Sequence, residues 1–305
     1  MKAQRRSSLF LIIALLIWLL ANAGRVRESA SDALRLCAVS VIPALFPFLV
    51  VTGLLMSLGF GAWASPILAP LMTGLYRLPG AAGSALLLGF LGGYPVGART
   101  AAELYRRGQL TKDETERLLT FCNNANPAFL MSVLGAGVFG STRTGIALLL
   151  IHVLSAFLTG LVFRHASDTP PARRDPPPLQ DAQGAFFAAF VDAVGNAASA
   201  MLRICAFVAF FYVLAQPLKN WDSPAAAPLV GALELFSLTP MLTPDWRGFV
   251  LASICAAWGG LSALGQPAAA LDAAGLSVRP CLRGKAVQAL FAGLLAALAS
   301  AVLQF

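Results

Sequence analysis

The residues most able to bind a ligand lie where apolar segments are interrupted, and the first interruption runs from Gly89 to Arg99. It places four glycines and Pro95 inside an otherwise apolar run. Gly and Pro loosen or break helices, and a backbone group freed inside a membrane must be satisfied by protein or by a water-lined cavity. The interruption therefore indicates a site. Small residues also recur at every fourth position, which would instead let two helices pack closely: Gly89, Gly93, Gly97 and Ala101.

Two further interruptions carry polar side chains. Residues 121–129 hold three asparagines and a proline between apolar runs, and residues 259–267 begin with two glycines and end in a Gln-Pro pair. Glu234 is the only charge on the apolar segment 225–242. Because an unpaired carboxylate in a membrane is costly and generally functional, we expect Glu234 to carry a coupling proton or to pair with Arg203.

Composition places the chain in a membrane. It has 305 residues, 58% of them hydrophobic and 12% charged, and a mean hydropathy of +0.74, outside the usual range of soluble domains. The net charge of +8 comes without a stripe of basic and aromatic residues, so nucleic acid is not expected as a partner. The five cysteines are scattered without a C-x-x-C pair, so neither disulfides nor zinc is expected, nor another cofactor. The sequence therefore predicts an all-α polytopic protein of the lipid bilayer.

The N-terminal segment favours a retained anchor helix over a cleaved signal peptide. Basic residues precede the apolar run 9–21, and Ala21-Asn22-Ala23 resembles a signal-peptidase site. Multi-pass proteins commonly keep such a first helix, so residues 1–33 are predicted to be an anchor. A cytoplasmic N-terminus is expected from its positive charges, which are Lys2, Arg5 and Arg6.

Three features of the apolar segments predict local structure. Pro43 and Pro47 should kink or split the helix that carries them. Residues 63–78 suit a membrane interface because they hold Trp, Tyr and Arg. Residues 144–163 form a clear span, in which His152 is expected to be a packed residue rather than a ligand.

The polar segments predict caps and a linker. In the charged stretch 99–117, Gly108 suits a helix C-cap, and Thr111 with Glu114 fits a capping box. Residues 167–184 are rich in proline and are predicted to be an exposed linker. A short polar segment at 279–285 precedes the final apolar span.

An internal repeat relates the two halves. A shift of 167 residues superimposes Gly92-Gly93 on Gly259-Gly260, Ala101-Ala102 on Ala268-Ala269, Leu104 on Leu271 and Gly108 on Gly275. Paired interrupted segments at matching positions of two halves point to a transporter site near the bilayer midplane. We therefore expect two inverted repeats, residues 34–166 and 185–305, with their Gly-Gly pairs facing each other.

These residues together resemble the sporulation integral membrane protein YlbJ (SpoVV) family. The resemblance rests on Gly93-Tyr94-Pro95-Val96-Gly97-Ala98-Arg99, the Asn123-to-Pro127 break, Glu234, and Gly259-Gly260-Leu261-Ser262 with Gln266. That family carries the nucleoside-recognition or Gate domain, which is similar to the core of concentrative nucleoside transporters. The resemblance implies interrupted helices, re-entrant hairpins, and movement of dipicolinate from the mother cell toward the forespore, at the outer forespore membrane.

The resemblance also implies a substrate site for a small organic anion. Broken helices offer free N–H groups and positive dipole ends, Arg99 can supply a cation, and Asn, Ser and Gln side chains can donate to carboxylates or a ring nitrogen. The residues expected to bind substrate are Gly93, Tyr94, Pro95, Gly97, Arg99, Asn123, Asn124, Asn126, Glu234, Gly259, Gly260, Ser262 and Gln266. A coupling ion, H+ or Na+, and a homo-oligomer are compatible with this interpretation.

Three alternatives stand beside an anion transporter. A nucleoside-type or other small-solute transporter would use the same architecture. A membrane enzyme would need a nucleophile with a base, or a metal cluster, and the sequence has no His-Glu-x-x-His, no paired aspartates and no Gly-x-Ser-x-Gly. A non-transporting sporulation scaffold would explain the apolar spans but would leave the matched interruptions without a purpose.

Overall fold

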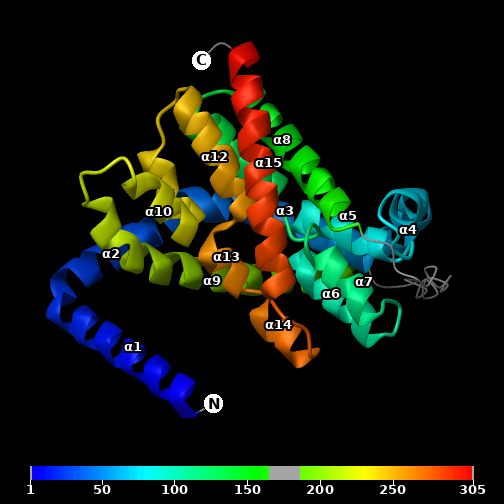
Figure 1. The fold of residues 1–305 in the computed structure, drawn as a ribbon, viewed down its shortest axis with the longest axis horizontal. Coiled ribbons are helices and arrows are strands. Elements are labelled where there is room, and N and C mark those ends of the chain that lie inside the picture. The colour runs from blue at the N-terminus through cyan, green and yellow to red at the C-terminus, as the bar shows by residue number, and fades with distance from the viewer. Residues whose placement is uncertain (1, 165–185, 304–305) are drawn as a thin grey trace.

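The computed structural model describes residues 2–164 and 186–303, and its regular elements are all helical (Figure 1). The predicted linker at residues 167–184 lies outside the described residues. In the described part, five helices are long and apolar enough to cross a membrane: Ala23–Ser57, Thr142–Val162, Phe186–Lys219, Trp246–Gly265 and Arg279–Val302. The chain is thus a multi-pass membrane protein, as its composition predicts.

A long helix with a π-helical turn follows the N-terminal helix α1 (Lys2–Ala21). It consists of α2 (Ala23–Leu36), the π-helical η1 (Cys37–Val41) and α3 (Ile42–Ser57). Pro43 has no N–H to donate, and its ring would clash with the carbonyl four residues earlier in a regular α-helix. The wider turn directly before it removes this conflict. The helix therefore continues through Pro43 and Pro47 instead of splitting.

The rest of the first half is built from short helices and one span. Its elements are α4 (Phe60–Pro70), η2 (Leu71–Leu75), α5 (Ala82–Gly92), α6 (Val96–Arg106), α7 (Lys112–Leu119), η3 (Phe129–Val138) and α8 (Thr142–Val162). Neither α4 nor η2 is long enough by itself to cross a bilayer. Both lie largely within residues 63–78, the segment whose composition suits the membrane interface.

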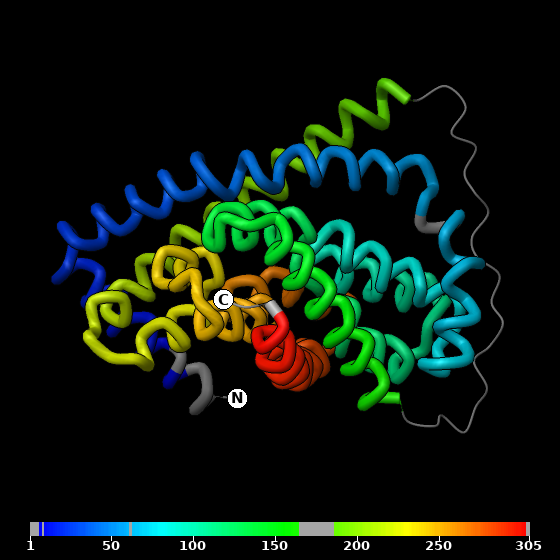
Figure 2. The backbone as a smooth tube through the Cα atoms, turned by 90° about the horizontal axis from the view of Figure 1, so that it is seen from above, coloured from blue at the N-terminus to red at the C-terminus, as the bar shows by residue number. Residues whose placement is uncertain are grey.

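The second half alternates long helices with short ones. Its elements are α9 (Phe186–Lys219), α10 (Ala226–Leu233), α11 (Leu235–Leu238), η4 (Thr239–Met241), α12 (Trp246–Trp258), α13 (Gly260–Gly265), α14 (Ala268–Ala273) and α15 (Arg279–Leu303). α9 runs beside α2 and α3, while α15 packs against α12 and α8 (Figure 2). The interrupted helices therefore lie among long ones.

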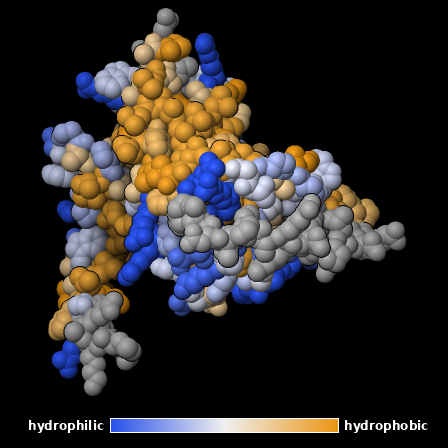
Figure 3. Space-filling model, turned by 45° about the vertical axis from the view of Figure 1, so that its right-hand side comes forward, coloured by the Kyte–Doolittle hydropathy of each residue, from blue (hydrophilic) through white to orange (hydrophobic). Residues whose placement is uncertain are grey.

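Long helices present apolar side chains to the outside (Figure 3). Leu290, Leu294 and Leu298 recur at every fourth position of α15 and are 63%, 55% and 72% exposed. Ile146 and Leu150 are exposed in the same way on α8. Exposed apolar stripes of this kind suit contact with lipid rather than water.

The two halves end a matching helix in the same way. Gly108 and Gly275 have φ values of +68° and +70°. The residue after Gly108 donates its N–H to the Leu104 carbonyl, and the residue after Gly275 donates to the Leu271 carbonyl, each at 2.9 Å. Leu104 and Leu271 belong to one hydrophobic cluster, so the two helix ends meet. The inverted symmetry of the complete halves stays a prediction.

The local caps predicted for the charged stretch are confirmed. Gly108 ends α6 with a positive φ. The Thr111 side chain accepts from the Glu114 N–H, and the Glu114 carboxylate accepts from the Thr111 N–H at 2.7 Å. This capping box starts α7 and fixes the turn between α6 and α7.

Candidate functional site

The first interruption forms the tip of a helical hairpin made by α5 and α6. Gly93 has a φ of +73°, which other residues rarely adopt, and a Cβ there would lie 2.8 Å from the Asn126 Cβ. Gly89 and Gly97 serve packing instead, because a Cβ on them would lie 1.6 Å and 1.9 Å from the Cys122 carbonyl oxygen. Thus Gly93 makes the turn, while Gly89 and Gly97 let the second interruption pack against the hairpin.

The second interruption joins α7 to η3 and is tied to the hairpin by Asn126. Its Nδ2 donates at 3.1 Å to the Leu91 carbonyl, one of the groups that the end of α5 leaves without a helical partner. Its Oδ1 accepts from the Ala128 N–H at 2.7 Å. Asn126 is 7% exposed. One buried side chain therefore satisfies backbone groups of both interruptions.

Two interruptions in the second half pair in a similar way. The chain breaks at Glu234, between α10 and α11, and at Gly259, between α12 and α13. A Cβ on Gly260 would lie 3.3 Å from the Glu234 Cα. The Trp258 Nε1 donates to the Ala232 carbonyl at 3.0 Å, which satisfies a group that the end of α10 leaves free. The two breaks therefore support each other.

Glu234 is almost fully buried, with 2% of its surface exposed. Its carboxylate accepts the N–H groups of Phe236 and Ser237 and so caps the start of α11. Arg203 is exposed on α9, and no ion pair of Glu234 occurs in the part of the chain that the structure describes. The pair expected between Glu234 and Arg203 is therefore not formed, because backbone donors occupy the carboxylate instead.

Tyr94 brings the two pairs of interruptions together. Its hydroxyl lies 3.5 Å from the Ala257 carbonyl oxygen, to which it donates. A Cβ on Gly259 would lie 2.6 Å from the Tyr94 Oη, and Gly259 has a φ of +87°. Because Gly259 has no side chain, the Tyr94 side chain fits beside this break. All four interruptions meet at one place.

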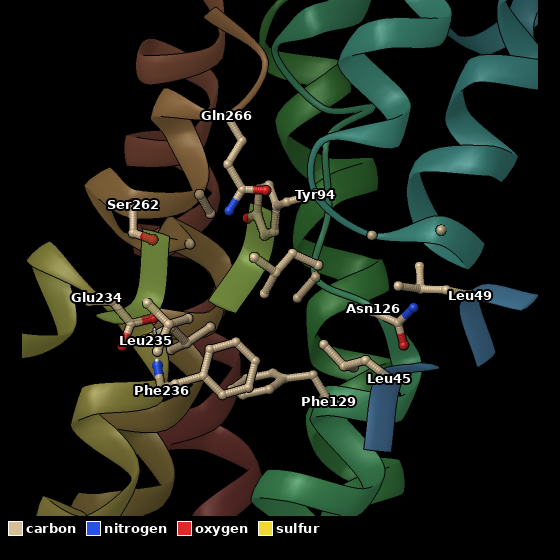
Figure 4. A pocket seen from close by; sticks show the side chains of 17 residues that line it. Leu45, Leu49, Tyr94, Asn126, Phe129, Glu234, Leu235, Phe236, Ser262 and Gln266 are labelled. Carbon is tan, nitrogen blue, oxygen red and sulfur yellow. Dashed lines mark hydrogen bonds between the residues drawn. The ribbon is translucent and has the colours of Figure 1, made fainter. Parts of the chain in front are cut away.

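A cavity of about 60 Å³ lies at this meeting point (Figure 4). Its polar side chains come from the interruptions and from α13: Tyr94, Asn126, Glu234, Ser262 and Gln266. Its apolar wall comes from α3, α9, η3 and α11: Leu45, Leu49, Ile204, Val208, Phe129, Leu235 and Phe236. The rings of Phe129 and Phe236 pack edge to face with centroids 4.8 Å apart. The cavity thus suits a small ligand with a flat apolar face and polar edges.

The structure places the thirteen predicted site residues in two groups. The cavity is lined by Gly93, Tyr94, Asn126, Glu234, Gly259, Ser262 and Gln266. The remaining residues do not belong to its lining: Pro95, Gly97, Arg99, Asn123, Asn124 and Gly260. In the second group, Gly97 and Gly260 make close contacts between interruptions, since a Cβ on them would lie 1.9 Å from the Cys122 carbonyl oxygen and 3.1 Å from the Leu233 carbonyl oxygen.

Arg99 lies on α6, outside the cavity, and is exposed. Because Arg99 opens a charged stretch, its long side chain can reach the surface from an apolar helix. The cation expected from the sequence is therefore not at the cavity wall.

A buried polar cluster beside Tyr94 has no counterpart in the sequence predictions. Lys285 and Gln288 of α15 are fully buried. The Lys285 Nζ donates to the Gln288 Oε1 at 2.6 Å, and the Gln288 Nε2 donates to the Asn124 Oδ1 at 3.1 Å. His152 is 2% exposed in α8, as expected for a packed residue, and its Nε2 accepts the Ala125 N–H at 3.0 Å.

One sequence signal could have found this cluster. Lys285 and Gln288 are three residues apart, which puts them on one face of a helix. Gly284 precedes them, and a Cβ there would lie 1.9 Å from the Thr120 carbonyl oxygen. The small residue therefore marks the face of α15 that packs into the protein.

Comparisons with known proteins confirm the resemblance that the motifs indicate. Residues 38–163 match the family model of the Gate domain, described as nucleoside recognition. The chain is 29% identical over 234 residues to the sporulation integral membrane protein YlbJ of Bacillus subtilis (strain 168). That match covers 70% of this chain and 57% of the Bacillus protein, little more than half of the relative's length. No solved structure matches the chain.

Proposed function

We propose that this protein is a membrane transporter of a small organic anion and that the cavity at the four interruptions is its substrate site. The observation that carries the proposal is the convergence of these interruptions on one cavity. Transporters commonly bind substrate between discontinuous helices, and a membrane protein tolerates unwound backbone where it lines such a site. The match to the Gate domain supports the same assignment.

The shape and chemistry of the cavity favour a flat ligand with polar edges. Phe129 and Phe236 can contact the face of a ring, and the amides of Asn126 and Gln266 can donate to carboxylates or to a ring nitrogen. Dipicolinate has this combination of groups, and the resemblance to a sporulation membrane protein family makes it the first substrate to test. Glu234 is the proposed site of a coupling ion, H+ or Na+.

A nucleoside is the second candidate, because the matching family model is described as nucleoside recognition. A nucleoside also has a flat ring and polar edges, but it carries no carboxylate. The charge of the accepted solute therefore separates the two candidates. If the protein instead has a non-transporting role in a sporulation membrane complex, neither solute should cross the membrane.

Uptake into vesicles containing only the purified protein tests the proposal. We expect radiolabelled dipicolinate to accumulate above the level in empty vesicles, and excess unlabelled dipicolinate to compete more strongly than uridine. Faster uptake of uridine would favour the nucleoside alternative. Uptake of neither solute above the empty vesicles would contradict transport.

Substitution of Gln266 tests the position of the substrate site. Gln266 lines the cavity, and its side chain takes part in none of the hydrogen bonds among the described residues. Its backbone N–H donates to the Ala263 carbonyl. We expect Gln266→Ala to fold normally and to weaken dipicolinate uptake about 10-fold or more, the effect of losing a hydrogen bond to a charged group. Gln216→Ala is the matched control, because Gln216 lines a separate cavity beside α1 and α2. Equal effects of the two variants would contradict the assigned site.

A further inference from the structure

Lys285 is a fully buried lysine whose amino group has few polar contacts. Its relative exposure is 0%, and the Nζ donates one hydrogen bond, to the Gln288 Oε1. No carboxylate of the described residues lies within 4.0 Å of the Nζ. A buried charge without an opposite charge costs several kcal/mol, and charged residues within membrane segments are usually functional.

The groups around Lys285 are polar but neutral, and several lack partners. Gln288 also donates to the His152 carbonyl at 3.3 Å, which links the cluster to α8. Within the described ranges, the Nδ1 of His152 is buried without a hydrogen-bond partner, and so are both polar atoms of Asn123, the residue before Asn124 in the chain. Buried polar groups in folded proteins rarely lack a hydrogen-bond partner. This region therefore contains buried polar atoms that are free to bind a ligand, and Lys285 gives the cluster a positive formal charge.

The ring of Tyr94 lies between this cluster and the cavity. The Lys285 Nζ lies 5.0 Å from the centroid of the Tyr94 ring, and Tyr94 lines the cavity. Asn124 of the cluster directly precedes Ala125, another residue of the cavity lining. The Tyr94 hydroxyl is held by a long contact of 3.5 Å. The ring of Tyr94 thus touches both places and is weakly tethered at its tip.

We propose that Lys285 is the cationic contact for a carboxylate of the transported substrate and that rotation of Tyr94 admits the carboxylate to it. This inference rests on the proposed function, because it names the group that selects anions at that site. An ammonium–carboxylate hydrogen bond is about twice as strong as a neutral one. It would replace the weaker contact of the ammonium with the Tyr94 ring. Lys285, rather than the exposed Arg99, then supplies the positive charge.

Ligand binding to the purified protein in detergent tests this role without requiring transport. The two probes are dipicolinate and its uncharged diamide, and the readout is the shift of thermal unfolding with ligand concentration. We expect Lys285→Met to weaken dipicolinate binding about 10- to 100-fold and to leave diamide binding nearly unchanged. Lys285→Arg should keep the preference for the carboxylate because it keeps the charge.

The controls separate a selective role from a structural one. Lys112→Met makes the same substitution at an exposed lysine and should behave like the unchanged protein. If Lys285→Met does not fold, Lys285→Gln gives the same readout, because it removes the charge and can still form a hydrogen bond to Gln288. Equal dipicolinate-to-diamide preference in the unchanged protein and a folded neutral variant would overturn the inference.

Failure of transport and failure of this inference give different results. Vesicles that take up neither probe, together with lysine-dependent binding in detergent, would reject the transporter and keep the carboxylate site. Uptake of dipicolinate that is unchanged in Lys285→Gln would keep the transporter and reject the role of Lys285. Equal binding of the acid and the diamide by the unchanged protein would also reject it.

Discussion

The buried charges of this chain differ in what compensates them. Arg117 is 5% exposed and pairs with Asp113 at 3.0 Å, and it also donates to the Arg77 carbonyl at 3.3 Å. Glu234 accepts from backbone N–H groups, and Lys285 donates to a neutral glutamine. A charge that has an opposite partner can be structural, whereas a buried charge held only by neutral groups is the kind expected at a functional site.

Substitution of Glu234 should separate its capping role from its proposed role in coupling. Glu234→Ala leaves two backbone N–H groups of α11 without an acceptor, so we expect a loss of about 1 to 3 kcal/mol in unfolding free energy. Glu234→Gln keeps one acceptor oxygen and should lose less. Arg203→Ala should have little effect, because Arg203 is exposed. Denaturant unfolding of the three variants in detergent measures these differences.

The same variants test coupling in vesicles. If Glu234 carries the coupling ion, Glu234→Gln should fold and take up substrate without dependence on a proton or sodium gradient. Gradient dependence equal to that of the unchanged protein would reject coupling at Glu234. Recovery of Glu234→Ala stability by a second substitution at Arg203 would contradict the observed backbone cap and favour an ion pair.

At the scale of single residues, the sequence predicts which groups are unusual better than it predicts their partners. Glu234 stands out because it is the only charge on its apolar segment. Its backbone partners depend on how the chain turns after α10, which its residue type does not reveal. Lys285 is missed for a different reason. It is the last residue of the polar segment 279–285, so its burial becomes visible only when α15 packs against α12 and α8.

At the scale of elements, the interruptions stabilise one another in pairs. Asn126 from one break donates to the carbonyl of Leu91 beside another, and Trp258 donates to the Ala232 carbonyl in the second half. A freed carbonyl inside a membrane protein must find such a donor. The positions of the breaks follow from Gly and Pro in the sequence. Their pairing depends on contacts between residues far apart in the chain, so it could not be predicted.

Gly93→Ala should be strongly destabilising because both the backbone and the space exclude a side chain. Gly93 has a φ of +73°, and the added Cβ would lie 2.8 Å from the Asn126 Cβ. We expect a loss of about 2 to 5 kcal/mol in unfolding free energy from strain and crowding. Denaturant unfolding of the purified variant in detergent measures it.

Gly195→Ala is the control for this substitution. Gly195 lies inside α9, nine residues after its first residue, and a Cβ there would meet no atom within 4 Å. Alanine in a helix interior should be neutral or stabilising by about 0.5 to 1 kcal/mol. If the two variants were equally stable, the turn at Gly93 would not be as tight as the structure has it.

At the scale of the whole molecule, local signals and membrane signals were the most informative. The capping box at Thr111 and the C-cap at Gly108 depend on a few neighbouring residues, and both form. The membrane class follows from composition, and exposed leucines along α15 agree with it. Of the kink or split expected near Pro43 and Pro47, the split is absent, because a π-helical turn before Pro43 accommodates the missing N–H. Rotational symmetry between the halves stays a prediction.

The orientation of the chain in the membrane is the last prediction. Lys2, Arg5 and Arg6 precede the apolar part of α1, and positive charges flanking a first helix favour the cytoplasmic side. The cysteine substitution Gln4→Cys reports this side directly. We expect a membrane-impermeant maleimide to label the Gln4→Cys protein only after the cells are permeabilised, since residue 4 is then reached from the cytoplasm.

The native cysteines give this experiment a low background. All five are buried: Cys37, Cys122, Cys205, Cys255 and Cys281. The unchanged protein should therefore take up little reagent before or after permeabilisation, and it is the control for each condition. Because burial blocks the reagent on both sides of the membrane, labelling of Gln4→Cys can come only from residue 4. Labelling of that variant in intact cells would place the N-terminus outside and would contradict the predicted cytoplasmic position.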